Sequence, residues 1–417
     1  MKIPFSKADI LLPENADMSK WAVIACDQYT SEPEYWEDVT KIVGDEPSTL
    51  KVTLPEIYLE EDNVAEKIAE VNEEMKKLIN NNFFRTLKDS LIYVERTQAD
   101  GRIRKGLMGK VDLEDYSFAK DSQTLIRATE GTVLERIPPR VKVRENAPLE
   151  LPHIMLLIDD DKKEIIEGLT DKVSEEDKVY DTDLMKNGGH IKGYKLNDEL
   201  IEKVLEGIGK LADKEKFEQK YNVKDKGVLL FSVGDGNHSL ATAKTCYENL
   251  KKTLTKEEYE NHPARYALVE VVNLHSDALD FEPIHRVVVN PEHMMEELKK
   301  FYETSEEGEG QVIQYVYKGK KGKIVIKNPK SNLAVGSLQM FIDEYLKKNG
   351  GKVDYIHGEE TTEKLGEQEG NIGFLLPNMH KSELFKTVIL DGALPRKTFS
   401  MGHSYDKRYY LEARKIK

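Results

Sequence analysis

The stretch "FSVGDGNHSLATA", Phe231 to Ala243, decides the fold, because it joins an apolar run to a helical pattern through a polar turn. The apolar run from Val228 to Val233 has the length and composition of a central β-strand. After the turn, apolar residues recur at helical spacing, at Leu240, Ala243, Tyr247 and Leu250. The pattern predicts a strand, a tight loop and a helix, with Ser239 as the N-cap of that helix.

The loop carries polar groups at the point where the helix begins. Gly234 and Gly236 allow the backbone to turn sharply and to bring its amides close to a ligand. Unpaired N–H groups and the helix dipole attract anions at such a position. Asp235 could hold a metal or accept a proton, and His238 could donate to a phosphoryl oxygen or shuttle a proton. The alternative interpretation is ordinary turn chemistry around Asn237, with His238 as a capping residue.

Composition limits the classes of protein to which the chain can belong. Its 417 residues exceed one ordinary core, so we expect two or three domains. The net charge of −14 repels nucleic-acid phosphates and anionic lipids, and no window has the apolar length of a membrane span. We therefore expect neither a nucleic acid nor a membrane as partner. Because the chain has two cysteines, Cys26 and Cys246, and no signal-peptide pattern, we expect a cytoplasmic location.

Helix and strand patterns alternate along the chain, which predicts an α+β or mixed α/β fold. Residues 90–113 read as two strands joined by a hairpin turn at Asp100-Gly101, and Pro291 suits the first turn of a helix. The acidic, glycine-containing stretch 303–310 is the best linker candidate. We expect an N-terminal α+β domain over 1–200, a core with the strand–loop–helix over 201–307, and a C-terminal α+β region over 308–417.

A second strand–loop–helix pattern occurs in "ACDQYTSEPEYW", residues 25–36. Ser31 and Glu34 fit a capping box, so a helix is expected to begin there. Asp27 then lies in a loop at the end of a strand, which is a usual place for functional side chains. The alternative for Asp27 is a turn-forming role, and Cys26 is more simply explained as a buried, inert thiol.

Three further segments contain charged candidates. Residues 124–144 concentrate arginines that suit bidentate phosphate recognition, and they contain Glu130 as a possible base or metal ligand. The alternative is a solvated helix face with internal ion pairs. Residues 275–286 have a composition that can bind a divalent metal, although their spacing fits no strong ligand template. Residues 394–409 form a basic turn that could close over an anion, or an ordinary surface loop.

The turn and its flanks resemble a known family. A strand followed by "DGNHS" and a helix resembles the Asp-Gly-His-His-Arg box of the ParB/sulfiredoxin-like superfamily, and most of the chain resembles the DUF-1015 family. The segment with Pro283, Ile284, His285 and Arg286, and the box at Pro395 to Thr398, support this resemblance, as does, loosely, "VIACDQYT" near the start. No P-loop, G-x-G-x-x-G, H-E-x-x-H or G-x-S-x-G motif is present.

The resemblance implies a ParB/sulfiredoxin-like core with an additional α+β region, in which nucleotide or phosphate binds at the box. It implies that Asp235 and His238 line a phosphoryl-transfer site. Ser239 replaces the usual box Arg, and Asn237 the first His, so a phosphate clamp is missing unless another cation takes over. Together with the charges noted above, the resemblance favours these further site residues: Arg127, Glu130, Arg136, Arg286 and Lys397.

The first functional hypothesis is a phosphoryl-transfer enzyme that acts on a small hydroxyl-bearing metabolite with a nucleotide and Mg²⁺. Free serine or phosphoserine is the substrate suggested by superfamily analogy alone. Asp27, Glu130, Asp235 and His238 are the candidate catalytic residues. The alternatives are a non-catalytic nucleotide- or metabolite-binding regulator, and a metal-dependent hydrolase that uses residues 275–285. The single-site hypothesis requires the loops of Asp27 and Asp235 to lie together.

Overall fold

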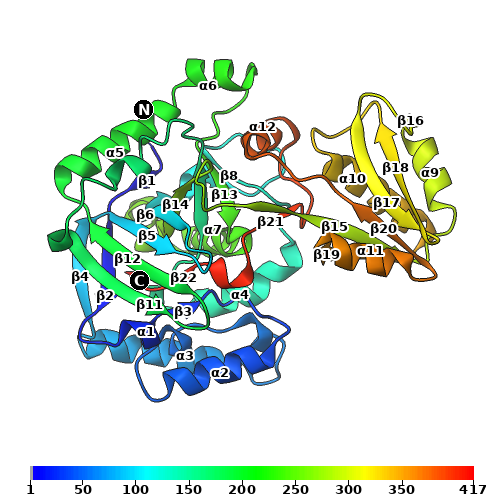
Figure 1. Cartoon of the computed structure of the whole chain (residues 1–417). Coiled ribbons are helices and arrows are strands. Elements are labelled where there is room, and N and C mark those ends of the chain that lie inside the picture. Colours follow the sequence, from blue (N-terminus) through cyan, green and yellow to red (C-terminus); the bar gives the residue numbers. More distant parts are fainter. Residues whose placement is uncertain (1–2) are drawn as a thin grey trace. The chain divides into compact units, whose positions relative to one another are not determined.

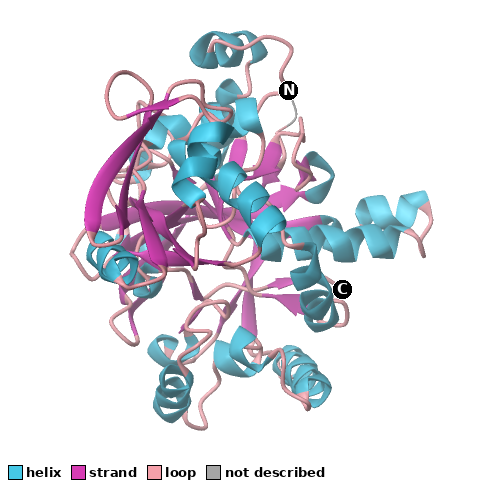
Figure 2. Cartoon of the chain, turned by 90° about the vertical axis from the view of Figure 1, so that its right-hand side faces the viewer, coloured by secondary structure: helices cyan, strands magenta, loops and turns pink. Residues whose placement is uncertain are grey.

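The computed structural model describes residues 3–417, which form two compact units with helices and strands mixed throughout (Figure 2). Unit 1 contains the chain up to Ala128, Thr132–Leu279 and His403–Lys417, and unit 2 contains Thr129–Gly131 and Asp280–Gly402. The predicted α+β class is confirmed. The boundaries expected at residues 200 and 307 do not coincide with these units, because the chain leaves unit 1 at Asp280 and returns at His403. The expected linker, residues 303–310, lies inside unit 2.

Unit 1 is built on a mixed sheet (Figure 1). The strand order is β11 (Lys178–Leu184), β12 (Gly189–Lys195), β5 (Ile92–Thr97), β6 (Ile103–Asp112), β14 (Tyr266–Asn273), β10 (Met155–Ile158), β13 (Phe231–Asp235), β8 (Ile126–Ala128) and β7 (Tyr116–Ser117), and β1 (Phe5–Ser6) also pairs with β6. The hairpin expected at Asp100-Gly101 joins β5 to β6. Strand β13 runs antiparallel to β10 and parallel to β8.

Apolar residues cover both faces of this sheet. Tyr93 and Leu107 belong to one core cluster, whereas their neighbours Ile92 and Met108 belong to another. Because successive side chains of a strand point to opposite faces, this alternation places one cluster on each side of the sheet. The helices of unit 1 are α1 (Met18–Trp21), α2 (Pro33–Val43), α3 (Val64–Asn80), α4 (Ile137–Arg144), α5 (Asp198–Leu211), α6 (Lys214–Tyr221), α7 (Asn237–Lys251) and α8 (Lys256–Asn261).

The last residues of the chain pair with segments from its first half. The pairs are β22 (Tyr409–Tyr410) with β3 (Val23–Ile24) and β23 (Arg414–Lys415) with β9 (Leu149–Glu150), and a further two-stranded sheet joins β2 (Ala8–Pro13) to β4 (Phe84–Ser90). The C-terminal segment therefore lies next to the loop that follows Ile24, where Asp27 stands.

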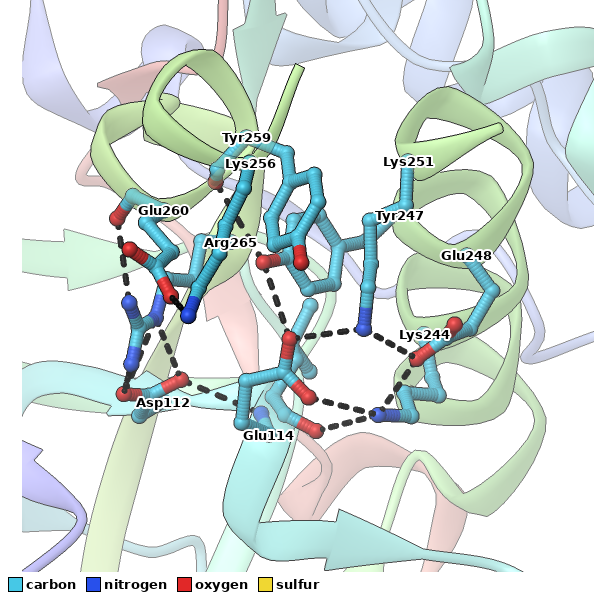
Figure 3. Close-up of polar contacts among 11 residues, drawn as sticks. Asp112, Glu114, Lys244, Tyr247, Glu248, Lys251, Lys256, Tyr259, Glu260 and Arg265 are labelled. Atoms are coloured by element: carbon cyan, nitrogen blue, oxygen red, sulfur yellow. Dashed lines mark hydrogen bonds and ion pairs between the residues drawn. The ribbon is translucent and has the colours of Figure 1, made fainter. Parts of the chain in front are cut away.

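Polar contacts hold the C-terminal half of α7 in place (Figure 3). Lys251 pairs with Glu114 at 2.8 Å, and the Tyr247 hydroxyl donates to the same carboxylate at 3.0 Å. Beside them, Arg265 pairs with Asp112 at 2.7 Å. Since Glu114 follows the last residue of β6 by two positions, its contacts with α7 anchor the far end of the helix next to the central sheet.

Unit 2 contains a second sheet with its own helices. Its strand order is β16 (Thr304–Ser305), β18 (Lys320–Ile326), β17 (Gln311–Tyr317), β20 (Asn371–Leu375), β15 (Phe281–Val289) and β19 (Lys352–His357), and β21 (Phe399–Met401) pairs with β15. The helices are α9 (Met294–Phe301), α10 (Ala334–Asn349), α11 (Glu359–Glu367) and α12 (Lys381–Asp391). Pro291 does not begin a helix, because α9 starts after His293, whose φ is +53°. Over residues 3–417, no helix is long and apolar enough to cross a membrane.

Candidate functional site

The strand–loop–helix expected around Asp235 is present in unit 1. Strand β13 ends at Asp235, Gly236 is the N-cap, and α7 begins at Asn237. The prediction that Ser239 caps the helix was wrong, because the N-cap is Gly236, three residues earlier, and Ser239 lies in the first turn of the helix. The strand starts at Phe231 rather than Val228, since residues 228–230 make no regular ladder. The Ser239 hydroxyl is thereby free of the capping role and faces a histidine.

Gly236 has a backbone conformation that favours glycine. Its φ is +77°, and a Cβ at this position would lie 3.0 Å from the Cα of Ile154. We expect Gly236→Ala to lower the free energy of unfolding by about 1 to 2 kcal/mol, because an L-residue is strained at positive φ. Urea unfolding measures this change. The matched control is Gly168→Ala, which meets no atom within 4 Å; equal losses in the two variants would contradict the argument.

Five side chains of unit 1 gather around the buried imidazole of His153, and these six residues are called the His153 cluster. They are Asp27, His153, Asp235, Ser239, Lys407 and Tyr410. His153 lies two residues before Met155, the first residue of β10, whose register partner in β13 is Asp235. The histidine reaches the cluster because β10 and β13 are neighbours, and Lys407 reaches it through the returning C-terminal segment. The structure thus brings the loops of Asp27 and Asp235 together, as the single-site hypothesis requires.

The imidazole of His153 uses both of its ring nitrogens. Nε2 lies 2.9 Å from the Ser239 hydroxyl and 3.6 Å from Oδ2 of Asp27, and Nδ1 lies 2.8 Å from the Tyr410 hydroxyl. The backbone N–H of Cys26 donates to the same Tyr410 hydroxyl at 3.1 Å. The Lys407 ammonium lies 3.2 Å from Oδ2 of Asp235. The cluster therefore contains two pairs of a carboxylate and a basic group, Asp27 with His153 and Asp235 with Lys407.

Charge and burial act against each other in this cluster. Burial alone would raise the pKa of Asp27, but the His153 imidazolium and a hydrogen bond from Gln28 hold it well below its usual range. Burial alone would lower the pKa of His153, but the carboxylates of Asp27 and Asp235 outweigh burial and raise it. Asp27 and His153 therefore stabilise each other in their charged forms.

An ion pair lies beside the cluster. Glu56 and Arg140 form a bidentate salt bridge in which each side chain is 15% exposed. Burial raises the pKa of Glu56, and the Arg140 charge only partly offsets this effect. Burial also raises the pKa of Cys26 well above its usual range, so the thiol is poorly suited to act as a nucleophile. This agrees with the inert role expected for it.

Not every predicted residue lies in the cluster. Arg127 is buried at the opposite end of β13, where its guanidinium donates to the carbonyls of Thr124, Gly227 and Val228. This use of the guanidinium argues against a phosphate-binding role. Arg136 is exposed. The Nε2 atom of His238 accepts a hydrogen bond from Val133 N at 3.4 Å, so one ring nitrogen serves the adjacent segment.

Gly234 lies in β13 of unit 1, whereas Glu130, Arg286 and Lys397 belong to unit 2. Glu130 forms a β-bridge with Leu394, and the Arg286 guanidinium is buried, donates to Gln339 and lies over the Tyr355 ring. Lys397 is exposed and has a φ of +52°. Burial lowers the pKa of Arg286 to about 10.

The arrangement does not support a metal site at residues 275–285. His275, in unit 1, pairs with Asp159 at 2.6 Å, whereas His285, in unit 2, accepts from Leu376 N at 3.0 Å. Over residues 3–417, no three His, Cys, Asp or Glu side chains are placed to hold a metal ion together.

Sequence reasoning missed His153, Lys407 and Tyr410. A histidine directly before the apolar run "IMLLI" was the available signal for the first, and the basic segment 394–409 contained the second. Neither pattern shows which other residues lie nearby, because His153 contacts residues that are 86 and 257 positions away in sequence, Ser239 and Tyr410.

Comparisons with known proteins place the chain in a family. Solved structures with partial similarity include a free serine kinase in complex with AMP, at 12% identity and TM-score 0.38, covering 74% of this chain and 91% of that one. SbnI with a C-terminal truncation from Staphylococcus aureus gives 10% identity and TM-score 0.39, with coverages of 74% and 87%. No curated protein matches the chain. A family model described as "Protein of unknown function (DUF1015)" matches residues 4–345, and the chain belongs to this family.

Proposed function

We propose that the His153 cluster is the centre of a phosphoryl-transfer enzyme that uses a nucleotide and a small hydroxyl-bearing substrate. The observation that carries this proposal is the contact of two carboxylates, Asp27 and Asp235, with two basic groups, His153 and Lys407, at the start of α7. Phosphoryl transfer depends mainly on positioning and on charge neutralisation, and this set of groups supplies both.

Lys407 takes the place of a missing phosphate clamp. Ser239 stands where the resembling box has an arginine, so the loop itself offers no cation. The ammonium of Lys407 lies at the loop, 3.2 Å from Asp235, although Lys407 belongs to the C-terminal segment of the chain. Together with the dipole of the 15-residue helix α7, this ammonium favours an anion at the helix N-terminus.

The two carboxylates suit different tasks. His153 holds Asp27 ionised, so Asp27 is a poor proton acceptor and a good fixed charge. Asp235 is assigned the role of general base. The substrate oxygen bonds to the terminal phosphorus of the nucleotide, the bond from that phosphorus to the bridging oxygen breaks, the hydroxyl proton passes to Asp235, and the nucleoside diphosphate leaves.

Mg²⁺ would accompany the nucleotide. Carboxylate oxygens are the protein ligands that Mg²⁺ prefers, usually one or two of them with phosphate oxygens, and Asp27 and Asp235 offer this donor type. The ion would neutralise charge on the phosphates. In this structure, His153 contacts Asp27 and Lys407 contacts Asp235, and these contacts hold the two carboxylates in place.

The test is Asp235→Asn, assayed with ATP, GTP and CTP against a panel of hydroxyl compounds that includes serine and phosphoserine. Turnover is expected to fall by about 100-fold or more while nucleotide binding, measured by thermal shift, is retained. The matched control is Asp183→Asn, whose side chain is 88% exposed. A variant that keeps full turnover would contradict the role of Asp235. Nucleotide binding without any turnover by the native protein would favour a regulator instead.

A further inference from the structure

A cavity of about 140 Å³ opens beside the His153 cluster inside unit 1. Most of its lining is apolar, and it includes Val52, Leu54, Met75, Val143, Ala147 and Leu268. These residues come from the segment before α3, from α3 and α4, from the residues after α4, and from β14. The cavity is partly open to solvent, and a concave, mostly apolar surface with some polar groups is the usual form of a small-molecule site.

Part of the lining is polar: His153, Ser239 and Tyr410 come from the cluster, and the other polar lining residues include Thr53, Thr242, Glu56, Arg140, Arg144 and Glu150. His153, Ser239 and Tyr410 belong to the lining, whereas Asp27, Asp235 and Lys407 do not. His153 and Ser239 are thus shared between the cavity and the proposed reaction centre. A ligand that fills the cavity with its polar end at His153 and Ser239 lies next to Asp27, whose Oδ2 is 3.6 Å from Nε2 of His153.

The charged residues of the lining pair with other residues of the chain, so they do not favour a charged ligand. Glu56 is bound by Arg140, and Glu150 is bound by both Arg144 and Arg414. Because each carboxylate already has its guanidinium partner, an ionic ligand in this space would compete with pairs that are largely buried. A neutral apolar group meets no such cost.

The volume limits the size of that group. An apolar cavity of about 150 Å³ in a protein core stays dry and binds benzene. A cavity of about 140 Å³ accommodates an apolar group of the same size, which is a ring or branched chain of about six carbons. Free serine has no such group and would leave the space unfilled.

We propose that the acceptor substrate carries a neutral apolar group of about the size of a benzene ring, held in this cavity, with its hydroxyl at His153 and Ser239. Phosphorylation of the hydroxyl rests on the proposed function, whereas binding of the apolar group in the cavity does not depend on that function. The proposal replaces serine with a different class of acceptor, an apolar alcohol.

Benzyl alcohol is the probe, and its binding is measured by calorimetry and by thermal shift without nucleotide. Native protein is expected to bind benzyl alcohol and to show no response to serine at the same concentration. Ala147→Leu fills the cavity and is expected to weaken benzyl alcohol binding at least tenfold, and Ala147→Val tests the same point if the leucine variant fails to fold. Ala65→Leu, at an exposed position in α3, is the matched control.

The outcomes separate the two proposals. Absence of benzyl alcohol binding to the native protein, or unchanged binding to a folded Ala147 variant, overturns the cavity proposal. Binding that is retained in Asp235→Asn supports it, since that residue does not line the cavity. If benzyl alcohol binds at the cavity but no nucleotide phosphorylates it, the cavity site stands and the assignment of an apolar alcohol as phosphoryl acceptor fails.

Discussion

Replacing Arg408 with methionine is expected to lower the free energy of unfolding by about 3 to 5 kcal/mol, because it removes the cation that two buried carboxylates share. The Arg408 side chain is 1% exposed, and those of Glu270 and Glu412 are 0% exposed. Arg408 Nε lies 3.0 Å from Glu270, and a terminal nitrogen bonds Glu412. Burial disfavours the guanidinium charge, yet the two carboxylates raise the pKa of Arg408 above its usual value.

Two neighbours of these carboxylates compensate only in part. Tyr180 donates to Glu412 at 2.6 Å but is neutral, and the Arg104 guanidinium lies at a longer distance, 3.8 Å, from Glu270. Urea unfolding followed by circular dichroism measures the loss. The matched control is Arg136→Met, an exposed position where the change should stay within about 0.5 kcal/mol. Similar stabilities for the two variants would show that the buried charges are compensated by other means.

Replacing His153 with leucine is expected to lower the free energy of unfolding by about 3 kcal/mol, because Asp27 loses its compensating charge. The His153 side chain is 7% exposed and that of Asp27 is 26% exposed, so solvent reaches the carboxylate only in part. The hydroxyls of Ser239 and Tyr410 also lose their hydrogen-bond partner. Each unsatisfied buried polar group adds to the loss.

A double-mutant cycle isolates the charge effect from the loss of packing. Asp27→Asn removes the carboxylate, so the double variant His153→Leu/Asp27→Asn should lose about 1 to 3 kcal/mol less than the sum of the single variants. His190→Leu is the matched control, since His190 also contacts carboxylates but is 33% exposed. Additive losses in the cycle would contradict the mutual stabilisation of Asp27 and His153.

Local patterns predicted the elements that depend on neighbouring residues. The alternation in residues 90–113 led to the β5–β6 hairpin, and the apolar run before Asp235 with the helical spacing after it led to β13 and α7. Ser239 was misassigned as a cap because Gly236 can adopt the positive φ that starts the helix earlier. The preference of serine for the N-cap position is a statistical tendency, and here a glycine that adopts a positive φ three residues earlier takes that position instead.

Long-range pairing decided the composition of the site. Arg127 looked like a phosphate ligand in the sequence, but its guanidinium is used by the carbonyls of Thr124 and of residues 227 and 228. The division of the candidates between two units also depends on where the chain leaves and re-enters unit 1, and no composition change marks those points.

The sequence by itself determined the α+β class, the Asp235 loop at a helix start and the family resemblance, because these depend on periodicity and on short motifs. Only the tertiary structure decided that His153 and Lys407 join Asp27 and Asp235, and that an apolar cavity adjoins them. The physical reason is that β-pairing brings the start of β10 beside the end of β13 and returns the C-terminal segment to β3. Such contacts arise from burial of the whole sheet, which is shared by residues far apart in the chain.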